Sequence, residues 1–282
     1  MKTVWITGAG GLIGSYLVRS APGFVPDARV RALTRECLDL TDFSAVRAEF
    51  HRQQPHLVIH CAALSKSTEC EADPSLARRL NVEVTALLAE LAAGIPLIFL
   101  STDLVFDGRT GNYEESAATN PLGVYAETKV AAEQIVLANP NHTIIRTSLN
   151  GGTSPTGDRG FNELMRRSWR AGQTLRLFTD EFRSPVSAEV TARAIWELAA
   201  LDRPGVYHVA GSERLSRWQI GRLLAARWPQ LEPRLEAASL KEYRGVPRAP
   251  DTSLNCAKAQ KLLSFRLPGL TEWLAAHPEE AF

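Results

Sequence analysis

The stretch Thr3-Val-Trp-Ile-Thr-Gly-Ala-Gly-Gly-Leu-Ile-Gly14 decides the fold of this chain. An apolar run rich in β-forming residues stops at Gly8, and from residue 15 to residue 20 the apolar residues recur at helical spacing. The order is therefore strand, glycine turn, helix. Gly8, Gly11 and Gly14 form a Gly-x-x-Gly-x-x-Gly pattern, which is a spacing variant of the fingerprint of dinucleotide-binding folds.

Glycines in such a turn let the backbone bend tightly and approach a pyrophosphate, whose charge then lies at the N-terminus of the following helix. Leu12 and Ile13, inside the turn, are expected to line the same ligand. The alternative is a glycine turn that only packs the helix on the sheet. The strand before the turn and the helix after it favour cofactor binding.

Strands alternate with helices along the first half of the chain. Predicted strands lie at 30–33, 37–41, 57–61, 97–101 and 142–146, and predicted helices lie at 42–53, with Thr41 as the cap, and at 73–93. A second type of helix signal, good helix formers without interruption, covers residues 124–133. This alternation predicts an α/β fold with a doubly wound parallel sheet of the Rossmann type, and ligands are expected outside the carboxyl ends of its strands.

The residues after the second strand bear on the choice of cofactor. At this place an acidic residue selects NAD, whereas an arginine accommodates the 2′-phosphate of NADP. Arg35 is present and no acid follows it immediately, so NADP(H) is favoured and NAD(H) is the alternative; a solvated arginine with no ligand would give the same pattern. Asp39, beside Leu40, either reaches the adenine or only fixes the turn.

The strand at 57–61 ends in side chains that leave room for a cofactor. Cys61, Ala62 and Ala63 follow one another at its carboxyl end, and we expect the cofactor to lie against them. His60 precedes them, but a histidine in such an apolar strand is more often a core residue than a catalytic one, so we give it no role.

The helix at 124–133 carries a candidate proton donor. Tyr125 and Lys129 stand four residues apart, so their side chains should emerge on one helical face. The ammonium favours the tyrosinate and is expected to lower the pKa of the phenol toward the working pH, as general acid–base catalysis requires. Thr102 and Asp103 directly follow the strand at 97–101. A hydroxyl at this place can hydrogen-bond a substrate carbonyl or merely cap a turn.

Beyond residue 150 the periodicity loosens. The loop at 151–160 is rich in Gly, Ser, Thr and Pro and is interpreted as an active-site lid or a flexible connection. Helices are predicted at 161–171, 188–200 and 217–228, and a late strand at 206–209. We expect a nucleotide-binding Rossmann domain at 1–150 and a smaller substrate lobe at 151–282, from which a part near 184–210 returns to the first domain.

Composition excludes several classes of function. The 282 residues include 32 basic and 31 acidic side chains, so neither nucleic acid nor a membrane surface is expected as a partner. The four cysteines show no Cys-x-x-Cys spacing, which favours free thiols in a reducing compartment over disulfides or a metal site. There is no signal-peptide pattern and no apolar run that could span a bilayer, so a cytoplasmic location is expected.

Several motifs in order resemble those of extended short-chain dehydrogenases/reductases. These motifs are the glycine pattern, Cys61-Ala-Ala63, Leu100-Ser-Thr-Asp-Leu-Val-Phe-Asp-Gly108, Pro121-Leu-Gly-Val-Tyr-Ala-Glu-Thr-Lys129 and Arg146-Thr-Ser148. Within that family the chain is most similar to the dTDP-4-dehydrorhamnose reductase branch, and the likeness continues through Asp180-Glu-Phe-Arg-Ser-Pro185 to 248–255. The resemblance thus covers essentially the whole chain.

The resemblance implies roles for particular residues. Thr102 would orient a sugar carbonyl, Tyr125 would give it a proton, and Lys129 would bind the nicotinamide ribose and hold down the tyrosine pKa. Ala62, Ala63 and Arg35 would line the cofactor. The implied activity is NADP(H)-dependent reduction of a keto group on a nucleotide-linked sugar, with dTDP-4-dehydrorhamnose as the default.

Two other functions fit the same resemblance. One is a nucleotide-binding regulatory subunit like the β subunit of methionine adenosyltransferase, and the other is an NAD-dependent nucleotide-sugar epimerase or dehydratase. A homodimer is compatible with each of them.

The chain departs from the pattern of these reductases on the substrate side. Leu104 stands where they usually have Tyr, Leu149 where they usually have Trp, and Arg183 where they usually have Gly. Thr102, Asp103, Leu149 and Arg183 are therefore the expected substrate-binding residues.

Overall fold

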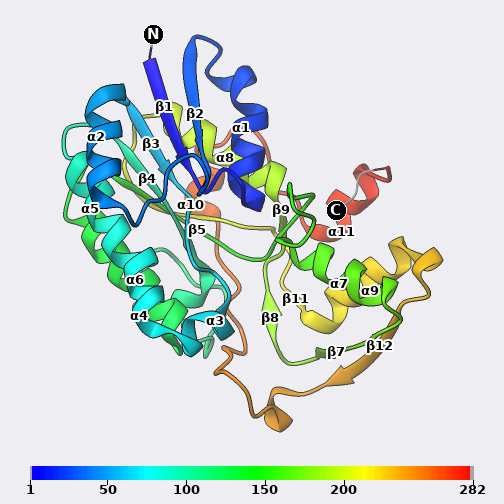
Figure 1. Cartoon of the computed structure of the whole chain (residues 1–282). Coiled ribbons are helices and arrows are strands. Elements are labelled where there is room, and N and C mark those ends of the chain that lie inside the picture. The colour runs from blue at the N-terminus through cyan, green and yellow to red at the C-terminus, as the bar shows by residue number, and fades with distance from the viewer. Residues whose placement is uncertain (1, 280–282) are drawn as a thin grey trace.

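A six-stranded, fully parallel sheet lies at the centre of the computed structural model, which describes residues 2–279 (Figure 1). The strand order is β10-β5-β4-β3-β1-β2. The strands are β1 (Lys2–Thr7), β2 (Ala28–Leu33), β3 (Leu57–His60), β4 (Leu97–Thr102), β5 (Thr143–Thr147) and β10 (Gly205–Val209). The predicted fold class, a doubly wound parallel α/β sheet, is confirmed.

Helices cover both faces of this sheet (Figure 1). On one face α1 packs against α8, and on the other lie α2, α5 and α6. Their bounds are α1 (Leu12–Phe24), α2 (Phe43–Gln53), α5 (Val84–Leu91), α6 (Val124–Leu137) and α8 (Ala188–Ala200). Because successive strand side chains point to opposite faces, Val4 and Ile6 of β1 join the core beneath α1 and α8, whereas Trp5 joins the opposite core. Among residues 2–279, no helix is long and apolar enough to cross a membrane.

The topology places a switch point at the end of β1. β1 pairs with β2 on one side and with β3 on the other, so the direction of chain winding reverses there. In open α/β sheets ligands bind outside the carboxyl ends of the strands at this switch point. The glycine turn after β1, the residues after β3 and those at the end of β4 all lie at that edge.

The predicted strand at 37–41 is wrong. This segment is a series of turns, because Cys37 and Leu38 both donate their backbone N–H groups to the carbonyl of Thr34. The cap of the following helix is also one residue later than predicted: the Asp42 carboxylate, not Thr41, accepts a hydrogen bond from Ala45 N at 3.0 Å.

The predicted helix at 73–93 is interrupted. It is built of α4 (Pro74–Arg78), a π-helical segment at Arg79–Glu83 and α5, and a short helix that the sequence did not predict, α3 (Ser67–Ala72), precedes it. A single wide turn in an α-helix often marks a functional position. Here it contains Asn81.

The remaining elements form the smaller, lower right part of Figure 1 together with segments that return to the sheet. The helices are α7 (Phe161–Arg170), α9 (Arg217–Arg227), α10 (Ala257–Gln260) and α11 (Leu270–Ala276). The strands are β6 (Asn150–Gly151), β7 (Thr174–Phe178), β8 (Phe182–Arg183), β9 (Val186–Ser187), β11 (Leu215–Ser216) and β12 (Arg234–Ala238). β7 pairs in parallel with β12, β6 in parallel with β9, and β8 antiparallel with β11.

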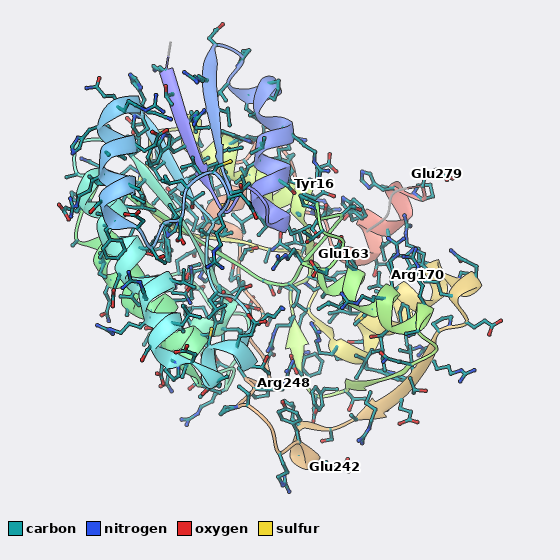
Figure 2. The ribbon with its side chains drawn as sticks, viewed as in Figure 1. Tyr16, Glu163, Arg170, Glu242, Arg248 and Glu279 are labelled. Carbon is teal, nitrogen blue, oxygen red and sulfur yellow. The ribbon has the colours of Figure 1, made fainter. Side chains whose placement is uncertain are left out.

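The loop at 151–160 is held by hydrogen bonds from several side chains, of which Glu163 makes the most. Glu163, at the start of α7, accepts hydrogen bonds from the backbone N–H groups of Ser154 and Gly160, each at 2.8 Å. On the opposite side, the Tyr16 hydroxyl of α1 accepts from Thr153 N at 3.1 Å. Figure 2 shows Tyr16 and Glu163 where α1 and α7 come together. The loop is thus anchored at both parts of the molecule.

Two glycines of α1 differ sharply in their surroundings, which gives a stability test. A Cβ on Gly14 would collide with the carbonyl oxygen of Gly8, whereas a Cβ on Gly23 would meet nothing within 4 Å. We expect Gly14→Ala to destabilise the protein by about 1–3 kcal/mol. Gly23→Ala, the matched control, should be neutral or stabilising by up to about 1 kcal/mol. Urea unfolding measures both, and equal effects of the two variants would contradict the close packing of this turn.

Candidate active site

The glycine turn approaches the end of β3 at backbone distance. Gly8 has a φ of +67°, and a Cβ there would stand 2.7 Å from the backbone nitrogen of Ala62. Gly11 N donates to Gly8 O at 2.8 Å. Gly11 is the residue that precedes α1, and having no side chain it does not cap the helix. The amides of the first helical turn are therefore left for an anionic ligand. The structure brings the predicted residues Gly8, Gly11, Gly14 and Ala62 together.

The other predicted cofactor residues lie around this turn. Leu12 is buried, and Ile13 is half-buried and packs against the core beneath α1. Cys61 and Ala63 flank Ala62, and burial raises the pKa of the Cys61 thiol to about 12, so it stays protonated.

The segment after β2 contains Arg35 and Asp39, two predicted cofactor-binding residues, in different surroundings. Arg35 is exposed in the turn that follows the strand. Asp39 accepts hydrogen bonds from the Thr41 backbone N–H at 2.9 Å and the Thr41 hydroxyl at 2.8 Å, and these two bonds lower its pKa. Of the two roles left open for Asp39, the structure therefore shows it fixing the turn. Leu40 packs against the core on the α2 face.

His60 is held by two hydroxyls. Its ring nitrogens lie 2.7 Å from Thr7 Oγ1 and 3.1 Å from Thr85 Oγ1. Burial, followed by the charge of Lys129, lowers its pKa to about 3, so the ring is neutral at pH 7. Thr7 Oγ1 also accepts from Ala62 N at 3.3 Å. The histidine thus fixes the ends of β1 and β3 relative to each other.

Tyr125 and Thr102 meet at the carboxyl end of β4. Tyr125 is the second residue of α6, and its phenol lies near the side chain of Thr102. Burial raises the pKa of Tyr125, Asp103 raises it further, and the interaction with Thr102 opposes them. The predicted direction of this pKa shift is therefore wrong, because spacing on a helix does not register how deeply the phenol is buried.

Lys129 points toward β4 beneath the tyrosine. It is only 2% exposed, its Nζ donates to Leu100 O at 2.7 Å and lies 3.8 Å from the centroid of the Phe99 ring. Burial lowers its pKa to about 7, and Glu133 is first among the groups that oppose this shift. Tyr125 and Lys129 share a helical face, as predicted, at the carboxyl end of β4.

Asp103 anchors the substrate side of the site. Its Oδ2 accepts from the hydroxyls of Ser148 at 2.7 Å and Thr252 at 2.9 Å, and the Nε of Arg183 lies 3.8 Å away. Asp103 therefore connects the end of β4 to two other segments. Leu149, next to Ser148, packs against the core beneath α1 and α8.

Arg183 belongs to a buried network that sequence reasoning missed. Its guanidinium donates to the carbonyls of Phe182 and Ala249 and lies 3.1 Å from Glu181. Glu181 also accepts two hydrogen bonds from Arg248, at 2.6 and 2.9 Å. Figure 2 places Arg248 where the two parts of the molecule meet. The segment 180–185 contains the signal that could have revealed the pair, since an acid stands two residues before Arg183.

Asn81 was given no role in the sequence analysis. Its amide exchanges hydrogen bonds with the backbone of Leu64, at 2.8 and 3.1 Å, and donates to Thr128 Oγ1 at 2.9 Å. Thr128 in turn donates to Tyr125 O at 2.7 Å. The π-helical turn thus positions the segment after β3 against the N-terminal part of α6, which carries Tyr125.

Two cavities lie near these elements. A small one is lined by Tyr125 together with Leu104 and residues 246–247, and so adjoins the predicted chemistry. A larger one, about 450 Å³, lies against Tyr207 and Lys258 and is lined by none of the predicted site residues. Within residues 2–279, no three His, Cys, Asp or Glu side chains are grouped to hold a metal ion.

Several known proteins are similar to this chain in sequence and in fold. A dTDP-4-dehydrorhamnose reductase of Sinorhizobium fredii is 30% identical over 282 residues, covering 95% of this chain and 93% of the relative. Methionine adenosyltransferase 2 subunit beta of Xenopus laevis is 29% identical over 271 residues, covering 91% and 81%. A crystal structure of dTDP-4-dehydrorhamnose reductase from Bacillus anthracis in complex with NADP superposes with a TM-score of 0.89 at 25% identity, covering 98% of each chain.

The resemblance inferred from the sequence motifs is confirmed by these relatives. A family model described as the RmlD substrate binding domain matches residues 1–280. The chain therefore belongs to the RmlD substrate binding domain family.

Proposed function

We propose that the protein is an NADP(H)-dependent reductase of a keto group on a nucleotide-linked sugar, with dTDP-4-dehydrorhamnose as the default substrate. The observation that carries the proposal is the placement of Tyr125 beside Thr102 at the carboxyl end of β4, one helical turn from the buried Lys129. The reductase relatives and the NADP complex of the Bacillus anthracis protein support the reaction type and the cofactor.

The raised pKa of Tyr125 suits a proton donor. Its phenol is protonated at pH 7. A general acid must carry its proton before the reaction in order to donate it. Thr102 orients the sugar carbonyl, Tyr125 protonates the carbonyl oxygen, and the Lys129 ammonium stabilises the tyrosinate that forms. The bound nicotinamide supplies the hydride. Lys129 also binds its ribose, and the glycine turn at 8–14 holds the pyrophosphate.

The remaining parts of the proposal concern the residues that line the ligands, the location of the protein and its assembly. Asp103, Leu149 and Arg183 line the sugar side, and residues 151–282 form most of the substrate lobe. Arg35 faces the 2′-phosphate of NADP. We place the protein in the cytoplasm, and a homodimer is the proposed assembly.

A second candidate function is favoured by the relative of Xenopus laevis. As a regulatory subunit, the chain would bind NADP(H) and a methionine adenosyltransferase without turning over a sugar. Incubation with NADPH and a panel of nucleotide ketosugars distinguishes the two candidates. Cofactor oxidation supports the reductase, whereas NADPH binding without oxidation, together with capture of the synthetase, supports the regulatory subunit.

Removing the phenol hydroxyl tests the proposed acid. We expect Tyr125→Phe to lower kcat by at least about 100-fold, because general acid catalysis contributes that much, while NADPH affinity changes little. Tyr207→Phe is the matched control, since it also removes a buried hydroxyl, one that donates to Arg203 O at 2.9 Å. Steady-state kinetics and NADPH fluorescence titration measure both. Unchanged turnover in Tyr125→Phe rules out the assignment.

Removing Arg35 tests the preference for NADP. Arg35→Ala should weaken NADPH binding about 10-fold or more, because a charge-assisted hydrogen bond to phosphate is lost, and should leave NADH binding nearly unchanged. Arg29→Ala is the control, since Arg29 is exposed at the opposite end of β2. Dissociation constants for both cofactors decide the question. Equal weakening of NADPH and NADH would remove the case for NADP.

A further inference from the structure

A buried ion pair lies one turn beyond Lys129 on the same face of α6, and the reaction described above does not use it. Glu133 follows Lys129 by four residues, so the two side chains are neighbours on the helix surface. Glu133 is 2% exposed and pairs with Arg146 of β5, which is 4% exposed. Arg146 Nε donates to Glu133 Oε1 at 3.0 Å and Nη2 donates to Oε2 at 2.7 Å.

Arg146 is itself held on two further sides. Its Nη1 donates to Glu115 O at 3.4 Å, and its guanidinium carbon lies 5.2 Å from the centroid of the Phe106 ring. A two-pronged arginine–carboxylate pair fixes direction as well as distance. The Glu133 carboxylate is consequently fixed in place on the face of α6 that carries Lys129.

Stability alone is a weak reason for such a pair. Removing two charges from water costs about as much as their attraction returns, and apolar residues of similar volume often replace a buried ion pair without loss of stability. Arg47 and Glu90 form a two-pronged pair of the same residue types on the surface of the molecule. Such an exposed pair adds little to the stability of the fold. The buried pair differs from it in what stands beside it.

The groups that face Lys129 are neutral at pH 7, apart from Glu133. From β3, His60 and Cys61 face it, and burial lowers the pKa of His60 to about 3 and raises that of Cys61 to about 12. From β4 it meets the Leu100 carbonyl and the Phe99 ring. On its own helix, Tyr125 is neutral as well. Glu133 is therefore the carboxylate that counters the burial of the Lys129 ammonium.

We propose that Glu133 is a positioning residue for the reaction: it favours the protonated form of the buried Lys129, and Arg146 holds Glu133 in the place where it can do so. The consequence for turnover rests on the proposed reductase function. The electrostatic part does not, and it can be measured without a substrate.

The titration of Lys129 is observable directly. The sequence has six lysines, so 15N labelling of lysine gives few side-chain signals, and Lys129→Gln assigns the one of interest. Glu133→Gln removes the negative neighbour, which favours the neutral amine, so Lys129 loses its proton at lower pH. We expect the midpoint to fall by about one pH unit or more. Glu90→Gln, the same substitution in the exposed pair, should leave the midpoint unchanged.

Turnover provides the second measurement. The alkaline limb of the kcat profile should move to lower pH by the same amount in Glu133→Gln, since the fraction of protonated Lys129 governs it. Glu133→Asp keeps the charge and should restore most of the wild-type midpoint. A midpoint in Glu133→Gln equal to that of the wild type overturns the proposal, as does a Glu133→Asp variant shifted as far as Glu133→Gln.

Leaving Arg146 buried without its partner could prevent Glu133→Gln from folding. The double variant Glu133→Gln/Arg146→Met replaces both charges by neutral groups of similar size and avoids an unpaired charge. It should also lower the Lys129 midpoint, and an unchanged midpoint in a folded double variant overturns the proposal. If the wild-type protein reduces no ketosugar, the reductase function fails, while the 15N titration still decides the role of Glu133.

Discussion

The close contact between Gly8 and the backbone of Ala62 is the constraint on which the cofactor side of the site depends. It joins the end of β1 to the end of β3, at the point where the winding of the sheet reverses. A side chain at position 8 would push these two strand ends apart and close the space above them. The hydroxyl of Thr7 and the ring of His60 hold the same strand ends from within the core, so the separation of these ends is fixed both by a missing side chain and by a buried hydrogen bond.

Most of the sheet could be predicted from the sequence, because its signals are local. The apolar runs of β1, β3 and β4 are bounded by turn residues, and the helix spacing after Gly11 and around Tyr125 is regular. The errors arise where a side chain competes with the backbone. Asp39 accepts the N–H of Thr41, which stabilises a turn where a strand was expected. The π-helical turn depends on contacts of Asn81 with segments 17 and 47 residues away, which no local pattern reveals.

The site shows the same division between spacing and environment. Placing Tyr125 and Lys129 on one helical face needed only a period of 3.6 residues. The direction of the Tyr125 pKa shift needed the burial of the phenol and the nearby Asp103 carboxylate, which only the folded chain shows. The part that Arg248 plays in the network of Glu181 and Arg183 likewise could not be derived, since Arg248 stands 67 residues from Glu181 and meets it only in the folded chain.

The charged groups around the end of β4 differ in how fully they are paired. The carboxylates of Asp103 and Glu181 have their oxygens occupied by hydroxyls and guanidinium groups, which fixes their positions. The Lys129 ammonium has three donors, and its hydrogen bond to the Leu100 carbonyl engages one of them. The carboxylates near β4 are therefore held in rigid pairs, whereas the Lys129 ammonium keeps hydrogen-bonding capacity beyond its bond to Leu100.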